Sequence, residues 1–288
     1  MRAPLRLLPL LVALPLALTA CGNDDNSTVS TPSTSSAPLA SLLPADIKAK
    51  GKLVVGSDVA YAPVEFFDTD GKTVIGIDPD LGKAIGDQLG ITLEFQNATF
   101  DGLIASLKSK RIDLIMSAMS DNKKRQAEID FVDYFSAGTS IIVKKGTTGI
   151  ASLDDFCGKT VAIQQGTTQD DVAEAQKTKC GAKGLTILKF KTDPEALLQV
   201  KNGRAVADMN DFPVAAYTAQ KQPDFEVVGE QIEAGPYGVG VRKEDTQLRD
   251  ALQKALQALI DNGTYAKVLG KWQVTNGGLK TATVNAGT

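Results

Sequence analysis

The sequence predicts an α/β protein with two lobes, each built on a mostly parallel β-sheet flanked by helices. Short β-rich runs alternate with segments whose apolar residues recur at helical spacing, and the connections between them are short. This alternation is typical of parallel sheets that helices cover on both faces. The same architecture is expected twice, because a second series without sequence similarity to the first begins near Lys145.

The first series begins with the β-rich run Leu53–Gly56. A helix is expected after Asp78-Pro79, where aspartate can cap the helix and proline fits its first turn. The apolar residues of this helix recur at helical spacing: Leu81, Ala84, Ile85 and Leu89. The following elements are expected as a strand at 92–96, a helix at 100–108 and a strand at 113–116.

The second series predicts three further strand-helix pairs. The strands are expected at 160–164, 185–189 and 206–209, and the helices at 168–179, 194–202 and 213–220. Another strand is expected at 238–242. The apolar stripe from Leu248 to Ile260 predicts a last helix that ends at Asn262-Gly263.

The first twenty residues are typical of a secretory signal. Arg2 and Arg6 precede an apolar run, and Leu18-Thr19-Ala20-Cys21 has the form of a lipobox. A transmembrane anchor is the alternative, but the run is about twelve residues long, and a spanning helix needs roughly twenty. We therefore expect a signal peptide over 1–20, lipid on Cys21, and a mature protein anchored to the outside of the cell membrane.

Residues 22–43 are rich in Ser, Thr, Pro, Asn and Asp. This mixture has too little apolar surface to offset the entropy of ordering, so we expect 21–43 to be the lipidated cysteine and a disordered tether. The chain has 31 basic and 34 acidic residues, a net charge of −3. A mildly acidic chain does not favour nucleic acid or an anionic membrane surface as a partner.

Two cysteines remain once Cys21 is assigned to lipid. An even pair in an exported protein is more often a disulfide than a metal or catalytic site, so we expect Cys157 and Cys180 to be bonded. Two free buried thiols are the alternative. The chain contains no histidine, which argues against Ser-His-Asp and Cys-His catalysis and against the commonest zinc ligand. We expect no cofactor, no metal site and no catalytic residue.

Five stretches of the chain form a recognisable pattern through their order and spacing. They are GSDVAYAPVEF at 56–66, GIDPDL at 76–81, the segment from Phe100 through RIDLIMSAMS to Arg125, the segment 203–217, and GPYGVG at 235–240. Together they resemble the polar amino-acid-binding proteins of ABC importers, an extracellular solute-binding protein family (family 3) that includes bacterial lipoproteins. The resemblance covers about residues 52–272.

The resemblance implies a periplasmic-binding-protein-like fold of type II, in which two crossing segments join the lobes. Lobe 1 would comprise 44–142 and 238–288, and lobe 2 would comprise 143–237. The ligand would lie in the cleft between the lobes, which closes by a hinge motion. The implied function is capture of a polar or basic amino acid and delivery to a membrane permease paired with a cytoplasmic ATPase. We expect a monomer.

Arg125 matches the arginine that holds the ligand carboxylate in this family. A guanidinium group suits that role because its planar fork donates two parallel hydrogen bonds to one carboxylate. The alternative is a solvated charge in the run Lys123-Lys124-Arg125. Ser117 and Ser120 follow an apolar strand at its carboxyl end, where open α/β sheets bind ligands. Ser120 suits a side-chain contact and Ser117 a backbone contact, while Ala118 stands where many relatives have Ser or Gly.

Lobe 2 supplies two further candidates. The segment Gly166-Thr167-Thr168 lies between a strand and a helix, so its N–H groups could bind the same carboxylate. A plain helix cap by Thr167 or Thr168 is the alternative, and both can hold together. Asp211 matches the aspartate that accepts hydrogen bonds from the ligand ammonium group. Asp208 lies three residues earlier, but the spacing to Pro213 and Tyr217 favours Asp211.

Tyr61 and Phe100 match positions at which relatives place aromatic rings against the aliphatic part of the ligand. Core packing is the alternative for both, and especially for Phe100. Asp58 corresponds to an acidic position that contacts the side chain of basic ligands in relatives. It could equally pair with a neighbouring lysine or cap a turn.

Two other classes of function share this scaffold. The fold also resembles cyclohexadienyl dehydratases and the module attached to some lytic transglycosylases, and such an enzyme would need a positioned acid, for which Asp58 or Glu65 are candidates. A ligand-sensing protein is the third hypothesis, but it normally continues into a transmembrane and signalling segment, whereas this sequence stops at Thr288. Arg125 and Asp211 together suit a free amino acid, and no catalytic domain follows Trp272, which favours the binding protein.

Overall fold

The computed structural model describes residues 37–288. The predicted signal peptide, the lipidation site Cys21 and most of the predicted tether lie outside the described residues. The end of the tether is an exception, because residues 40–42 form the 3₁₀ helix η1 (Ala40–Leu42), and Leu43 is buried in the core. The folded chain therefore begins before residue 43, where we expected the tether to end, and it continues into α1 (Ala45–Lys50).

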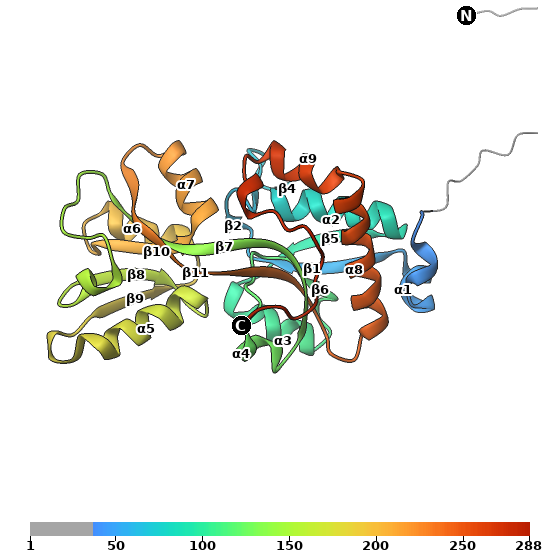
Figure 1. Ribbon diagram of the computed structural model, residues 1–288, viewed down its shortest axis with the longest axis horizontal. Helices are drawn as coiled ribbons and strands as arrows, with labels where there is room; N and C mark the ends of the chain where they lie inside the picture. The colour runs from blue at the N-terminus through green and yellow to red at the C-terminus, as the bar shows by residue number, and fades with distance from the viewer. Residues whose placement is uncertain (1–36) are drawn as a thin grey trace, which may run out of the picture. The chain divides into compact units, whose positions relative to one another are not determined.

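One eight-stranded sheet runs through both lobes in the order β5-β1-β6-β11-β7-β10-β8-β9. Three of its strands pair in parallel in lobe 1: β1 (Lys52–Ser57), β5 (Thr92–Asn97) and β6 (Leu114–Ile115). Three pair in parallel in lobe 2: β8 (Thr160–Gln164), β9 (Thr186–Phe190) and β10 (Ala207–Asp211). The predicted α/β architecture of two lobes, each with mostly parallel strands, is confirmed (Figure 1).

Two long antiparallel strands connect the lobes. They are β7 (Asp130–Lys144) and β11 (Phe225–Val241), which pair along almost their whole length with three irregularities in register. The sequence analysis predicted only the end of β11 and made no prediction for β7. These strands are the two crossings, and the lobe boundaries at 142/143 and 237/238 stay a prediction.

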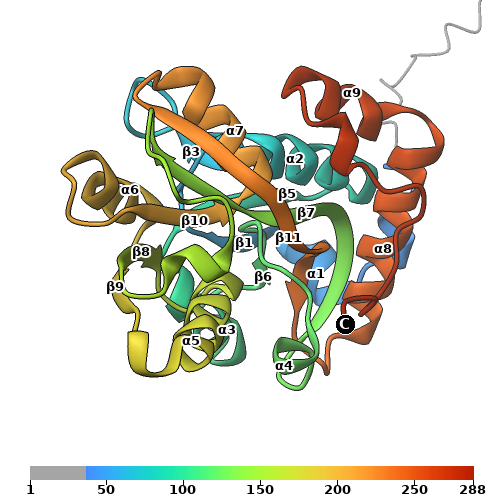
Figure 2. The same cartoon turned by 60° about the vertical axis from the view of Figure 1, so that its left-hand side comes forward.

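Helices cover both faces of the sheet, with α2 and α7 on one side and α3 and α5 on the other (Figure 2). Besides α1, the helices of lobe 1 are α2 (Ile77–Leu89), α3 (Leu103–Lys108), α4 (Lys123–Gln126), α8 (Thr246–Asp261) and α9 (Thr264–Lys271). Those of lobe 2 are α5 (Thr168–Cys180), α6 (Asp193–Lys201) and α7 (Phe212–Lys221). The apolar stripe predicted for α8 is buried from Leu248 to Leu259, so this helix packs as expected.

Short elements complete the fold. A small antiparallel sheet in lobe 1 consists of β2 (Ala60–Tyr61), β3 (Glu65–Phe67) and β4 (Val74–Ile75). The remaining 3₁₀ helices are η2 (Phe100–Gly102), η3 (Leu153–Phe156), η4 (Gly181–Lys183) and η5 (Thr275–Gly277). The helix predicted at 100–108 thus begins as the 3₁₀ turn η2 and continues as α3.

The start of α2 differs from the prediction. The helix begins at Ile77 without a side-chain cap, so Asp78 lies inside the first turn. The Asp78 side chain is fully buried and accepts a hydrogen bond from the Ala118 N–H at 3.3 Å. This aspartate therefore faces the interior of lobe 1 instead of capping the helix.

The predicted disulfide is present. Cys157 and Cys180 are bonded, with Cα atoms 5.2 Å apart, and they fix the end of α5 to the segment before β8.

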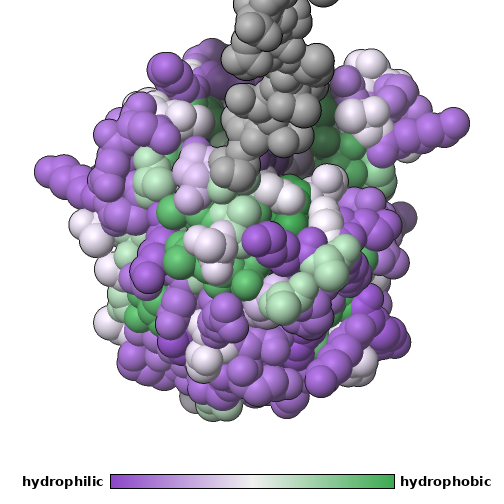
Figure 3. Space-filling view, turned by 90° about the vertical axis from the view of Figure 1, so that its right-hand side faces the viewer, coloured by the Kyte–Doolittle hydropathy of each residue, from purple (hydrophilic) through white to green (hydrophobic). Residues whose placement is uncertain are grey.

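On lobe 1, the face that carries α1 and α8 is largely polar around an apolar area in its middle (Figure 3). In residues 37–288 no helix is both long and apolar enough to cross a membrane.

Candidate functional site

A cavity lies between the lobes, where the chain leaves the carboxyl ends of β1, β6, β8 and β10. Both lobes line it, through Asp58, Tyr61, Glu65, Phe100, Ser117, Ala118, Ser120, Arg125, Gln164, Thr167, Thr168, Gln169 and Asp211. Eight of the nine predicted ligand-binding residues are in this set. The ninth, Gly166, does not line the cavity, but its carbonyl accepts a hydrogen bond from Arg125, which does. The free volume is about 10 Å³, barely enough for one water molecule. A larger ligand must therefore move side chains or separate the lobes.

Arg125 is a buried cation of this cavity and not a surface charge. Its side chain is 8 % exposed. Its guanidinium group donates to the Ser120 carbonyl at 2.8 Å and to the Gly166 carbonyl at 3.1 Å, and lies 5.3 Å from the centre of the Phe100 ring. Burial lowers the pKa of Arg125 to about 10, so the group stays charged at neutral pH. Its two partners lie in different lobes. Within residues 37–288 they use two of the five donors of the guanidinium group, which leaves three for a ligand.

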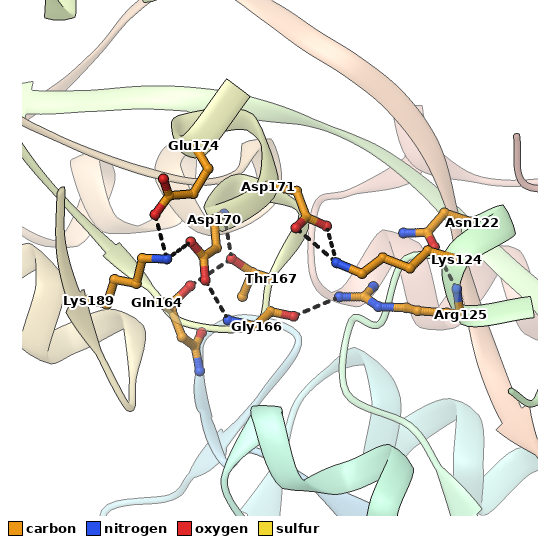
Figure 4. A network of polar contacts seen from close by, with 10 residues as sticks. All are labelled: Asn122, Lys124, Arg125, Gln164, Gly166, Thr167, Asp170, Asp171, Glu174 and Lys189. Atoms are coloured by element: carbon orange, nitrogen blue, oxygen red, sulfur yellow. Dashed lines mark hydrogen bonds and ion pairs between the residues drawn. The ribbon is translucent and has the colours of Figure 1, made fainter. Parts of the chain in front are cut away.

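The helix α4 holds Arg125 in place. The side chain of Asn122 caps this helix by accepting from the Arg125 N–H at 2.9 Å. The neighbouring Lys124 does not line the cavity and pairs with Asp171 of α5 at 3.0 Å (Figure 4). The run of three basic residues therefore divides into one buried cation and two exposed ones.

Ser117 and Ser120 occupy different positions in the site. The Ser117 hydroxyl accepts from the Asp58 N–H at 2.9 Å and donates to Glu65 Oε1 at 3.0 Å. That hydroxyl is committed to the protein, so a backbone contact is what Ser117 can offer. Ser120 uses its carbonyl for Arg125. Ala118 lines the cavity with a φ of 46°, an uncommon value for a residue other than glycine.

The segment at the start of α5 differs in part from its prediction. Thr167 caps the helix by accepting from the Asp170 N–H at 3.2 Å. The Gly166 N–H donates to the Asp170 carboxylate at 3.1 Å, and the Gly166 carbonyl accepts from Arg125 (Figure 4). We expected the Gly166 N–H to be free to bind the ligand. This expectation is wrong, because the carboxylate of Asp170 in the same turn already accepts its hydrogen bond. Thr168 lines the cavity.

Asp211 is the carboxylate that lobe 2 presents to the cavity. It accepts from the Tyr61 hydroxyl at 3.0 Å and from Gln169 at 2.9 Å, and its own N–H donates to the Tyr61 oxygen at 2.9 Å. Burial raises the pKa of Asp211 to about 6, against the opposing effect of these hydrogen bonds. Asp208 is fully buried within β10 and does not line the cavity. Tyr61 thus contacts lobe 2 directly.

Asp58 is a second buried carboxylate of the cavity. It is 5 % exposed and accepts from Gln164 at the end of β8. Burial raises its pKa to about 6. Neither a lysine pair nor a turn cap involves this side chain among residues 37–288. Asp58 therefore faces the cavity, with a glutamine of the opposite lobe as its partner.

Glu65 and Asp78 form a buried acidic pair beneath the cavity. Glu65 lines the cavity and is 1 % exposed, and Asp78 is fully buried. Burial, followed by repulsion from Asp78, raises the pKa of Glu65 well above its ordinary value, and burial raises the pKa of Asp78 to about 7. Within residues 37–288, Glu65 Oε2 and Asp78 Oδ1 have no hydrogen-bond partner. Burial thus shifts the pKa values of both carboxyl groups toward the protonated form.

Two cavity residues escaped the sequence analysis entirely: Gln164 and Gln169. Thr167 was named only as part of the segment 166–168. Glu65 was named only as a possible acid of an enzyme. Gln164 ends a predicted strand, and the carboxyl ends of parallel strands are where such folds bind ligands. That position could have indicated Gln164, whereas Gln169 carries no signal of its own in the sequence.

Ion pairs tie the lobes together beside the cavity. Asp101 of η2 pairs with Lys191, which follows β9, at 2.7 Å, and also accepts from Gln165. Lys124 of lobe 1 likewise pairs with Asp171 of lobe 2. With Arg125 bound to Gly166 and Tyr61 bound to Asp211, these contacts define a closed arrangement of the two lobes.

Comparison with known sequences agrees with this geometry. The model of the bacterial extracellular solute-binding proteins, family 3, matches residues 53–275. The chain is 30% identical to the arginine-binding protein ArgT of Corynebacterium glutamicum over 85% of this chain and 81% of ArgT. It is 35% identical to the lysine/arginine/ornithine-binding periplasmic protein of Escherichia coli over 76% of this chain and 86% of that protein.

Solved structures share the fold. An ancestral arginine-binding protein bound to arginine superposes with a TM-score of 0.74 at 36% identity, covering 77% of this chain and 98% of that one. The ancestral amino acid-binding protein AncCDT-1, a precursor of cyclohexadienyl dehydratase, has a TM-score of 0.72 at 36% identity, covering 79% of this chain and 97% of that one. The predicted two-lobed fold of type II is confirmed by these structures.

Proposed function

Since the chain belongs to the bacterial extracellular solute-binding proteins of family 3, we propose that it captures a basic amino acid between its lobes and delivers it to an ABC permease. The coarser part, an extracellular protein that binds a solute, follows from the family. The ligand class, the permease, the cytoplasmic ATPase behind it and the monomeric state belong to the proposal.

The observation that carries the proposal is a pair of opposite charges in one cavity. Arg125 supplies a cation from lobe 1 and Asp211 a carboxylate from lobe 2, and both are more than nine-tenths buried. A free amino acid carries the complementary pair, a carboxylate and an ammonium group on one carbon. A bidentate contact to Arg125 and a charge-assisted hydrogen bond to Asp211 would then bind the backbone of the ligand and favour closure.

Asp58 is the feature that favours a basic side chain. It presents a carboxylate to the same cavity from the end of β1, apart from Asp211 on β10. A buried carboxylate without a cation costs free energy, and the guanidinium or ammonium group of a basic ligand would offset that cost. The relatives named for arginine and for lysine, arginine and ornithine support the same ligand class.

The N-terminal signal completes the proposal. Residues 1–20 would direct export, and lipid on Cys21 would hold the protein at the membrane next to the permease. The family of extracellular proteins supports this location.

A calorimetric screen of the mature chain against the common amino acids tests the proposal. We expect arginine, lysine or ornithine to bind tightly, to raise the melting temperature and to be recovered unchanged. Binding of no amino acid would contradict the proposal. Conversion of a bound compound into a new product would support the enzyme hypothesis, which the relation to AncCDT-1 makes specific.

A further inference from the structure

The segment 282–287, which we call the strap, lies along the crossing strand β7. Val284 forms a β-bridge with Val132, and the Asp133 N–H donates to the Thr283 carbonyl at 2.9 Å. Asn285 exchanges two further hydrogen bonds with Phe131, at 3.2 Å from its N–H and at 2.8 Å to its Oδ1. The strap is therefore fixed to the strand that joins the two lobes.

The far end of the strap contacts the segment 120–126, which includes the short helix α4 and Arg125 and which we call the loop 120–126. The Gly287 N–H donates to Asp121 Oδ2 at 2.7 Å, and Asp121 is 3 % exposed. Gln126 contacts both residues, since its Nε2 donates to Asp121 Oδ1 at 2.8 Å and to the Gly287 carbonyl at 2.9 Å. The ends of the strap and of α4 lie close together in Figures 1 and 2.

These contacts enclose the residues that orient the guanidinium group. Asp121 directly follows Ser120, whose carbonyl accepts from Arg125, and Gln126 directly follows Arg125. On its other side the loop is held by β11, because the Asp121 N–H donates to the Pro236 carbonyl at 2.8 Å. The loop 120–126 is thus clamped between a crossing strand and the strap.

Gly287 fits its place with no room to spare. A Cβ atom at this position would lie 2.0 Å from the Asp121 carbonyl oxygen, and 2.5 Å from its carbon. Backbone atoms cannot yield as a flexible side chain can, so a methyl group here would displace either the strap or the loop.

We propose that the strap is a positioning element of the binding site, which holds the loop 120–126 so that Arg125 faces the ligand carboxylate. The inference rests on the proposed function in one respect, the assignment of Arg125 to that carboxylate. A merely structural strap would stabilise lobe 1 without affecting the affinity for ligand.

The test compares Gly287→Ala with a glycine elsewhere whose substitution is at least as disruptive. Gly229→Ala is the control, because a Cβ atom there would also lie 2.0 Å from a backbone oxygen, that of Ala151, outside the cavity, and the φ of 71° at Gly229 adds backbone strain that Gly287→Ala does not share. If Gly287→Ala costs the complex about the net free energy of one hydrogen bond, the dissociation constant for L-arginine should rise roughly two- to tenfold. Gly229→Ala should lower the melting temperature and leave the dissociation constant unchanged.

A double-mutant cycle with Arg125→Lys separates positioning from stability. If the strap acts through Arg125, Gly287→Ala should cause little further loss of affinity in the Arg125→Lys background. Additive losses, or an unchanged affinity in Gly287→Ala, would overturn the inference. If Gly287→Ala does not fold, Asp121→Asn replaces it in the same cycle with the same expectation.

The cycle also keeps two failures apart. Weaker binding in Arg125→Lys without any effect of Gly287→Ala overturns the strap alone. Unchanged binding in Arg125→Lys overturns the carboxylate assignment in the proposed function, whatever the strap does.

Discussion

Lys191 of lobe 2 and Asp101 of lobe 1 form an ion pair of 2.7 Å between the lobes. Their side chains are 56% and 27% exposed, so the pair contributes little to folding stability. Because the pair joins the two lobes, separating them would break it. Its contribution is therefore expected to fall on the closed state and on the lifetime of a bound ligand.

Replacing Lys191 by Ala should accelerate ligand dissociation by at most about fivefold, the range of an exposed ion pair. The difference from the native protein should shrink at high salt, because salt screens exposed charges. Stopped-flow dissociation at low and high salt measures both effects. Lys83→Ala is the control, since its partner Asp87 lies on the same helix. An equal effect of the two variants would contradict the role of Lys191 in closure.

Glu65→Gln should change how stability depends on pH. Burial raises the folded-state pKa values of Glu65 and Asp78 above their unfolded values. The stability that this pair contributes is therefore complete below the unfolded-state pKa values of about 4. It is lost as the pH rises through the raised folded-state pKa values, of which that of Asp78 is about 7, since the folded state must then give up its protons. The amide cannot ionise, so the variant should gain stability relative to the native protein between pH 5 and 8.

Thermal melts of both proteins across that range check the result. Buried carboxyl groups whose pKa Glu65 does not shift, such as Asp133, are present in both proteins and cancel in the comparison. A difference in melting temperature that stays constant with pH would show that Glu65 does not titrate there.

Asp58→Asn should alter the ranking of ligands. If Asp58 meets the side chain of a basic ligand, the variant loses a charge-assisted contact and binds arginine about tenfold or more weakly. A neutral ligand such as glutamine should bind as before, because specificity is a difference between affinities. Titration with the two ligands decides the point, and equal weakening of both would make Asp58 a structural residue.

Cys21→Ala should release the protein from the membrane. Lipid on Cys21 is the proposed anchor, and in residues 37–288 no helix could replace it by spanning the bilayer. Fractionation of cells that express the native and the variant chain measures the distribution. Retention of the variant in the membrane fraction would contradict the lipoprotein proposal.

The parts of this fold that sequence patterns predicted are those that local periodicity determines. The strand at 160–164 and the apolar stripe of α8 lie where expected because burial on one or both faces leaves a direct imprint on the residues. No periodic pattern of apolar residues in the sequence indicates how long β7 and β11 are. Their pairing is set by contacts between residues about a hundred positions apart, which periodicity does not report.

The site divides in the same way. Arg125, Asp211 and Asp58 could be predicted because each matches a ligand-binding position of the family that the sequence resembles, and the structure brings all three to one cavity. The capture of the Gly166 N–H by Asp170, the partnership of Gln164 with Asp58 and the contact of Gly287 with Asp121 could not. These are matters of side-chain direction and tertiary packing, which follow only once the two lobes and the strap are in place.

Calorimetric titration of L-arginine into the Arg125→Lys variant tests the central claim most directly. Lysine keeps the positive charge but loses the planar fork, so the account predicts a dissociation constant at least about tenfold higher than that of the native protein. A dissociation constant equal to the native value would contradict the assignment of Arg125 to the ligand carboxylate, and with it the amino-acid clamp between Arg125 and Asp211.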